Sequence, residues 1–134
     1  MKYNGIIENK LRVIEDKIES IKSWNIESLD TLKNSDLLQN AVERALQVAI
    51  EVMIDVSERI LALENVSPKE TAAANIKHLQ DIKVIVSAAE YMDMVRFRNF
   101  IVHRYEKIDN EIVYSIIKHK LHLFEKFVSE IRTT

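Results

Sequence analysis

One short stretch of the chain gathers side chains that could carry out acid–base and phosphate chemistry. Arg98 is followed directly by Asn99, four residues separate Arg98 from His103, and Tyr105 stands two places after His103. An imidazole exchanges protons near neutral pH, and a forked guanidinium binds an oxyanion through two parallel hydrogen bonds. These residues are therefore the candidate site.

Positive charge is concentrated around the same residues. Residues 96–107 contain four basic side chains against one acidic side chain, a local charge of +3, whereas residues 1–95 carry −5 and residues 108–134 are balanced. A helix C-terminus also attracts cations through its dipole, so the cluster alone does not require a ligand. An arginine spaced in this way from a histidine also arises by chance in many proteins. Whether these residues form a functional site or a structural cation cluster therefore has to be judged from the surrounding helices and motifs.

The composition restricts the folds and chemistries that are available. The chain has 134 residues, 47% of them apolar and 30% charged, so we expect one folded domain over 1–134. Without cysteine it has no disulfide, no thiolate zinc site and no thiol nucleophile. One glycine and one proline leave little from which to build tight β-turns or a glycine-rich phosphate loop. The composition therefore disfavours strands and nucleotide-binding α/β folds.

Helical periodicity runs through almost the whole chain, with apolar residues at steps of three and four. It predicts helices over 7–24, 36–63, 82 to about 102–105 and 110–131, a short connector over 25–35, and a further helix that begins at 67–70. The expected apolar face of the first helix is Ile7, Leu11, Ile14, Ile18 and Ile21, and that of the helix from 82 is Ile82, Ile85, Ala88, Ala89, Met92 and Val95. We therefore expect an all-α fold, a four- to five-helix up-and-down bundle.

Capping residues mark several of these helix starts. Ser67, Pro68 and Glu70 combine an N-cap serine, a proline at the first helical position and a glutamate placed to bond back to the cap. The other capping candidates are Asn34 or Ser35 before the long helix and Asp109 before the last one.

The segment Arg98-Asn99-Phe100-Ile101-Val102-His103-Arg104-Tyr105 resembles the motif of HEPN domains, an arginine followed after a few residues by a histidine. The tyrosine after the histidine makes it similar to the HepT toxins of bacterial and archaeal toxin–antitoxin pairs. The run Arg44–Glu51 also resembles the second-helix signature of these toxins, and the similarity covers the chain from about residue 37 to 128. The resemblance implies a HEPN-like bundle that works as a homodimer.

The resemblance also implies an enzyme, a metal-independent endoribonuclease toxin of a type VII pair that cleaves RNA such as tRNA or mRNA. In that activity His103 would take the 2′-hydroxyl proton or protonate the leaving oxygen. Arg98 would bind the negative charge that develops on the phosphate, and Asn99 would support one of them.

The spacing of Arg98 and His103 raises a geometric question. On an uninterrupted helix five residues turn through about 500°, which leaves the two side chains about 140° apart around the axis. Either the helix unwinds before His103, or a second subunit across a two-fold axis completes the site with the same motif. A dimer resolves the difficulty.

By the same resemblance, Tyr105 is where the antitoxin, a minimal nucleotidyltransferase of the MntA type, attaches adenylyl groups. The added phosphates would block the cleft and repel RNA. Residue type alone, without the resemblance, favours the interpretation of Tyr105 as an amphipathic aromatic at a helix end. Nearby rings on which RNA bases could stack are Phe97, Phe100 and Tyr105.

Two further polar groupings have a structural and a functional interpretation. On the helix over 36–63, a polar stripe is either a solvated face or the wall of a cleft: Arg44, Gln47, Glu51, Asp55 and Glu58. Glu51 and Asp55 lack the Glu-x-x-His pattern of helical di-metal sites. His119 and His122 on the last helix form part of a solvated basic face or a track for RNA phosphates, and two ligands are too few for a metal site. We expect neither a metal nor a cofactor.

A non-catalytic alternative uses the same residues. The chain could be a helical subunit that presents nucleotide or RNA to a nucleotidyltransferase without cutting it, or a purely structural dimerising bundle. No apolar run approaches the roughly 18–20 residues that span a bilayer, and the N-terminal segment carries charges at Glu8 and Lys10. We therefore expect no membrane segment and a cytoplasmic location.

Overall fold

The computed structural model describes residues 3–102 and 109–134, which form helices and no strand. The helices are α1 (Gly5–Ser23), α2 (Leu29–Lys33), α3 (Asp36–Leu63), α4 (Ala72–Asp81), α5 (Ala89–Val102), α6 (Asn110–His119) and α7 (Leu121–Arg132). The expected all-α class is confirmed. The described helices outnumber the expected four to five because the connector contains α2 and because the last helix is divided into α6 and α7.

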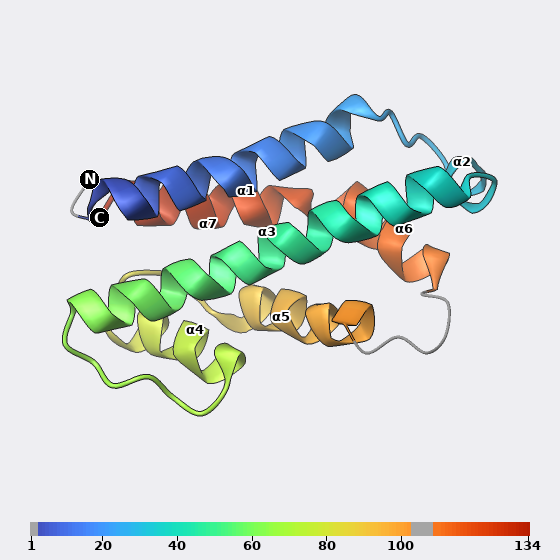
Figure 1. The fold of residues 1–134 in the computed structure, drawn as a ribbon. Helices are drawn as coiled ribbons and strands as arrows, with labels where there is room; N and C mark the ends of the chain where they lie inside the picture. The colour runs from blue at the N-terminus through green and yellow to red at the C-terminus, as the bar shows by residue number, and fades with distance from the viewer. Residues whose placement is uncertain (1–2, 103–108) are drawn as a thin grey trace.

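The long helix α3 is the central element of the bundle. It packs against α1, α4 and α5, while α7 packs against α1 and α6 packs against α2. Figure 1 shows α1 and α3 running alongside each other and α5 lying along another side of α3. The helix that carries Arg98 is therefore held against the longest described helix of the fold.

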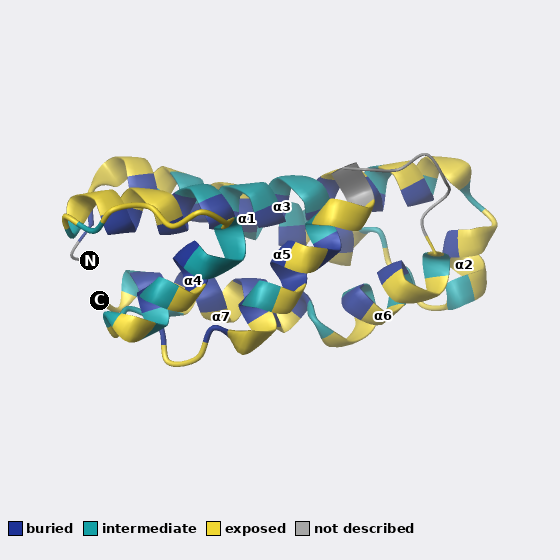
Figure 2. Ribbon diagram, turned by 90° about the horizontal axis from the view of Figure 1, so that it is seen from below, coloured by how far each residue is buried: buried dark blue, intermediate teal, exposed yellow. Residues whose placement is uncertain are grey.

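The core consists of the inward faces of these helices. In α1 the buried residues are the five that the periodicity predicts, Ile7, Leu11, Ile14, Ile18 and Ile21. Figure 2 shows the same division along the other helices, with buried residues on their inner faces and exposed residues outside. No described helix is both long and apolar enough to cross a membrane.

Two of the expected N-caps are confirmed. The hydroxyl of Ser35 accepts a hydrogen bond from the backbone N–H of Leu38 at 3.1 Å, and the carboxylate of Asp109 accepts one from Glu111 at 2.8 Å. Each satisfies a backbone donor that a helix start leaves unpaired.

The helix start expected at Ser67, Pro68 and Glu70 is wrong. The helix α4 begins instead after Thr71, whose hydroxyl accepts a backbone N–H of the first turn at 3.0 Å. The side chain of Asn75 accepts the backbone N–H of Lys69 at 2.7 Å. This bond fastens the segment before Thr71 across the start of α4, so the proline lies in the connection between two helices.

The helix expected from Ile82 begins later, at Ala89. Residues 82–88 form a loop in which Lys83 has a positive φ of 66°, and the N–H groups of Val84 and Ile85 bond back to the carbonyl of Leu79. These bonds satisfy the end of α4 and separate it from the next helix.

This later start changes the buried face of α5. Its buried residues include Tyr91, Met94 and Val95, whereas Ala89 is exposed and Met92 is half-buried. The apolar pattern that begins at 82 therefore continues across a loop, and only its last member, Val95, lies on the buried face of the helix.

The division of the last helix falls at Lys120, between α6 and α7. Neither glycine nor proline is present there. Because α6 packs against α2 and α7 against α1, the change of direction is favoured by two different partners and has no sequence signal of its own.

Candidate functional site

The start of α5 is fixed to the end of α7 by a buried tyrosine. The hydroxyl of Tyr91, a residue only 1% exposed, donates to the carboxylate of Glu130 at 2.6 Å. The same carboxylate accepts the backbone N–H of Val86 at 3.1 Å. The ring of Tyr91 packs edge to face on Phe127, with centroids 5.3 Å apart. We call Tyr91, Glu130 and Phe127 the α5 brace.

The α5 brace also affects ionisation. Burial, followed by the hydrogen bond to Glu130, raises the pKa of Tyr91 well above its ordinary value. The phenol therefore keeps its proton and acts as a hydrogen-bond donor across the physiological range.

Arg98 continues the buried row of α5. Its predecessors in that row are Tyr91, Met94 and Val95, which stand seven, four and three residues before it. The side chain of Arg98 is half-buried, because it extends from the core-facing side of the helix near its C-terminal end.

The guanidinium of Arg98 has a donor without an acceptor. Its Nε is buried, and among the described residues no oxygen accepts a hydrogen bond from it. A buried polar group without a partner costs about 1–3 kcal/mol, and charged groups cost more. The fold thus holds, at the end of α5, a cation that an incoming oxyanion would stabilise.

The other predicted site residues lie on different faces or outside the described residues. Asn99 is exposed, one position around the helix from Arg98. His103 and Tyr105 lie outside the described residues, so their relation to Arg98 stays a prediction. The described part of α5 runs to Val102.

The polar stripe on α3 lies partly in the seam with α1. Arg44 and Glu58 are exposed. Asp55 is half-buried, with Lys10 of α1 at 2.6 Å and Arg59 at 3.2 Å. Burial alone would raise the pKa of Asp55, but the hydrogen bonds from the two cations outweigh it and lower that pKa. This arrangement matches the interpretation of stabilising charge pairs for this part of the stripe.

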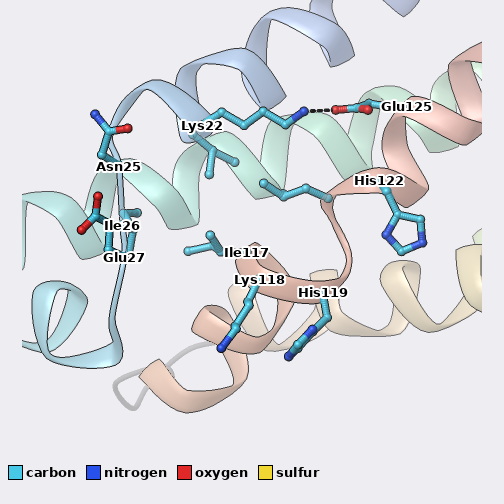
Figure 3. Close-up of a pocket in the computed structure, with 11 residues that line it drawn as sticks. Lys22, Asn25, Ile26, Glu27, Ile117, Lys118, His119, His122 and Glu125 are labelled. Carbon is cyan, nitrogen blue, oxygen red and sulfur yellow. Dashed lines mark hydrogen bonds and ion pairs between the residues drawn. The ribbon is translucent and has the colours of Figure 1, made fainter.

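His119 and His122 line a cavity of about 380 Å³ between the connection after α1 and the junction of α6 and α7. Figure 3 shows the two imidazoles pointing in different directions, while the ion pair of Lys22 and Glu125 spans another side of the cavity. Both histidines are exposed. Among the described residues no three His, Cys, Asp or Glu side chains gather closely enough to hold a metal ion.

Sequence reasoning missed the α5 brace, although one signal for it was present. A tyrosine in a buried row needs a partner for its hydroxyl. Tyr91 stands four residues before Val95, which belonged to the predicted apolar face, but the predicted register excluded it. Glu130 has no local signal, because its two partners come from a loop and a helix about forty residues earlier.

Comparison with known proteins covers nearly the whole chain. Residues 14–131 match the family model described as ribonuclease HepT-like. The mRNA nuclease HepT of Shewanella oneidensis is 27% identical over 131 residues, which are 96% of this chain and 98% of that protein. The tRNA nuclease HepT of Aphanizomenon flos-aquae is 26% identical over 130 residues, 96% of this chain and 88% of that protein.

Similarity extends to solved structures. The tri-AMPylated HEPN toxin of Shewanella oneidensis, in complex with its MNT antitoxin, superposes on this fold with a TM-score of 0.90. The two chains are 26% identical, and the superposition covers 98% of this chain and all of the toxin.

Proposed function

Because this chain belongs to the ribonuclease HepT-like family, we propose that it is the endoribonuclease toxin of a type VII toxin–antitoxin pair. It is an enzyme of the ribonuclease class, and it acts in the cytoplasm on tRNA or mRNA. The relatives that carry the name HepT are nucleases of these two RNA classes. The reaction uses side chains of this chain and no metal ion or cofactor.

The observation that carries the catalytic proposal is the unpaired donor of Arg98. The buried Nε of Arg98, which has no acceptor among the described residues, is already desolvated, so it gains more from a phosphate oxyanion than an exposed donor would. Such a group stabilises the extra negative charge that develops on the phosphate during cleavage. Arg98 is therefore the electrostatic part of the catalytic pair.

His103 is the proton-transfer part of the pair. An imidazole with a reference pKa of about 6.5 can take the proton of the 2′-hydroxyl and return one to the leaving oxygen near neutral pH. The chain acts as a homodimer, in which Arg98 of one protomer faces His103 of its partner. Asn99 is a supporting residue that orients the imidazole or binds a phosphate oxygen.

Tyr105 is the proposed point of control. A minimal nucleotidyltransferase of the MntA type attaches adenylyl groups to its phenolic oxygen, and their phosphates then exclude RNA by charge and bulk. The AMPylated state of the Shewanella toxin in its complex with the MNT antitoxin supports this proposal.

Cleavage of total RNA by the purified protein tests the function. We expect wild type and His78→Ala to cleave, and His103→Ala to be inactive while retaining its fold by circular dichroism. His78 is the matched control because it is a histidine on a different helix, α4, and belongs to neither the motif nor the basic face of the last helix. Cleavage by His103→Ala would contradict the catalytic role of this residue. Binding of RNA without cleavage by wild type would instead establish the non-catalytic helical subunit.

The same assay tests control by modification. Incubation with the nucleotidyltransferase and ATP should inactivate the wild type and add adenylyl groups that mass spectrometry locates at Tyr105. Tyr105→Phe should stay active under the same conditions, and its inactivation would show that the modified residue lies elsewhere.

A further inference from the structure

Of the four phenylalanines in this chain, one is exposed. Phe97, Phe124 and Phe127 are buried in the core, whereas Phe100 is 67% exposed. Exposing a phenylalanine forgoes about 1.5–3 kcal/mol of hydrophobic stabilisation. The exposed ring stands two residues after Arg98, so its position calls for a physical explanation.

The ring of Phe100 stands on the outward face of α5, among charged and polar side chains. Arg96, one turn earlier, is exposed and pairs with Asp93 at 2.7 Å. The other exposed residues of the described helix are Ala89, Glu90 and Asn99. A stable protein interface has a contiguous apolar centre, which the described part of this face lacks. A planar ligand, in contrast, needs only one aromatic ring on which to stack.

A nucleobase is a planar ligand that fits these surroundings. Every base has a π-face that stacks on an aromatic side chain, and proteins bind single-stranded RNA by combining such rings with positive charge. In the sequence, Phe100 lies within the segment 96–107, which has a net charge of +3.

We propose that Phe100 is a stacking platform for an unpaired base of the RNA substrate, a specificity-determining residue outside the catalytic pair. This inference rests on the proposed ribonuclease function. On an α-helix two residues turn through about 200°, so Phe100 faces away from Arg98 of the same protomer. The stacked base is therefore a flanking nucleotide and not the one at the phosphate that this guanidinium binds.

The position of the ring decides which kinetic constant it affects. A platform for a flanking base contributes equally to the bound substrate and to the transition state, so its loss raises KM and leaves kcat nearly unchanged. It also limits the substrate to RNA with an unpaired nucleotide flanking the cleavage site, because a base inside a duplex cannot stack on a protein ring.

Binding in the cleavage-deficient His103→Ala protein tests the platform directly. The probe is a short single-stranded RNA with the fluorescent base 2-aminopurine placed at each position in turn. With Phe100 present, we expect quenching at one position. Phe100→Leu keeps an apolar side chain but removes the π-face, and it should weaken binding about tenfold and abolish that quenching. Phe100→Trp should restore both.

Two controls keep the outcome specific to the ring. Leu63→Ala removes another exposed apolar side chain, at the far end of α3, and should bind RNA as the parent does. Duplex RNA of the same sequence should bind the parent protein and the Phe100→Leu variant equally. The oligomeric state of each variant is measured by light scattering.

The outcomes separate this inference from the proposed function. If wild type cleaves RNA but Phe100→Leu leaves binding, quenching and KM unchanged, the platform is wrong and the nuclease stands. If Phe100→Leu shifts the protein from dimer to monomer, the ring belongs to the subunit interface and the platform is wrong. If wild type neither binds nor cleaves RNA, both proposals fail.

Discussion

The seam between α1 and α7 and the C-terminal end of α5 each contain a half-buried arginine, in opposite surroundings. In the seam, Arg132 donates to both oxygens of Glu8 and of Glu15, at 2.6 to 3.1 Å. At the end of α5, the Nε of Arg98 is buried without an acceptor among the described residues. Arginine thus joins two helices in one place, and in the other it keeps a buried donor without an acceptor among the described residues. Buried polar atoms without a partner are uncommon in folded proteins and call for an explanation; among the described residues the other is Oδ1 of Asn110.

The largest expected effect is on Arg98. Arg98→Met keeps the length and apolar stem of the side chain and removes the charge. We expect RNA cleavage to fall about 10²–10³-fold, as for the loss of one oxyanion-binding group, while stability stays the same or rises because a buried donor without an acceptor is removed. Cleavage rates and urea unfolding of the same preparation check both parts. A loss of more than about 1 kcal/mol of stability would give Arg98 a structural role like that of Arg132.

The next effect concerns the α5 brace, which connects the two regions. Tyr91→Phe keeps the ring against Phe127 and removes the hydroxyl, so Glu130 loses a partner at 2.6 Å. We expect a loss of about 1–3 kcal/mol in urea unfolding, because the deleted bond has a charged acceptor. Relative to wild type, hydrogen exchange in this variant should increase more at the backbone amides of the start of α5 than at those of α1. A uniform increase across the fold would show that the brace does not act locally.

The smallest effect is the loss of the Arg132 cluster. Arg132→Met should cost about 1 kcal/mol at low salt and leave cleavage by the folded protein unchanged. The pH dependence of the unfolding free energy tests this cluster more specifically than the stability at one pH. The hydrogen bonds from Arg132 lower the pKa of Glu8 below its ordinary 4.5. Glu8 therefore contributes stability that is full above pH 4.5 and is lost as pH falls through its folded pKa.

Urea unfolding at several pH values compares wild type with this variant. Wild type should lose more stability than Arg132→Met between about pH 5 and pH 3, because the variant lacks the partner that lowers the pKa of Glu8. Parallel pH profiles for the two proteins would contradict the assignment of the acid dependence to this cluster.

The sequence predicted those features of the fold that depend on local chemistry. The apolar row of α1 and the caps at Ser35 and Asp109 each follow from the spacing or type of residues that are close in the chain. The start at Ser67 failed because a bond from Asn75 to the preceding segment competes with it. The division at Lys120 was not predictable, because α6 and α7 contact different helices.

For the candidate site, residue types and motif resemblance singled out Arg98, but only packing shows that its Nε is buried without an acceptor among the described residues. The sequence named Phe97 and Phe100 together as possible rings for RNA. Three positions on a helix turn through about 300°, so Phe97 and Phe100 point only about 60° apart. At the end of α5 this small difference in direction separates a core residue from a surface one. The difference arises from which helices cover α5, and that is a tertiary property.

The α5 brace has a consequence for a chain that is still being synthesised. Glu130 follows Tyr91 by 39 residues, so α5 emerges from the ribosome before the carboxylate that fixes its first turn. At roughly 5–20 residues per second, the interval is about 2–8 s. During that time the first turn of α5 lacks its hydrogen bond to Glu130, so the nascent chain has not yet completed the fold that holds Arg98 in place.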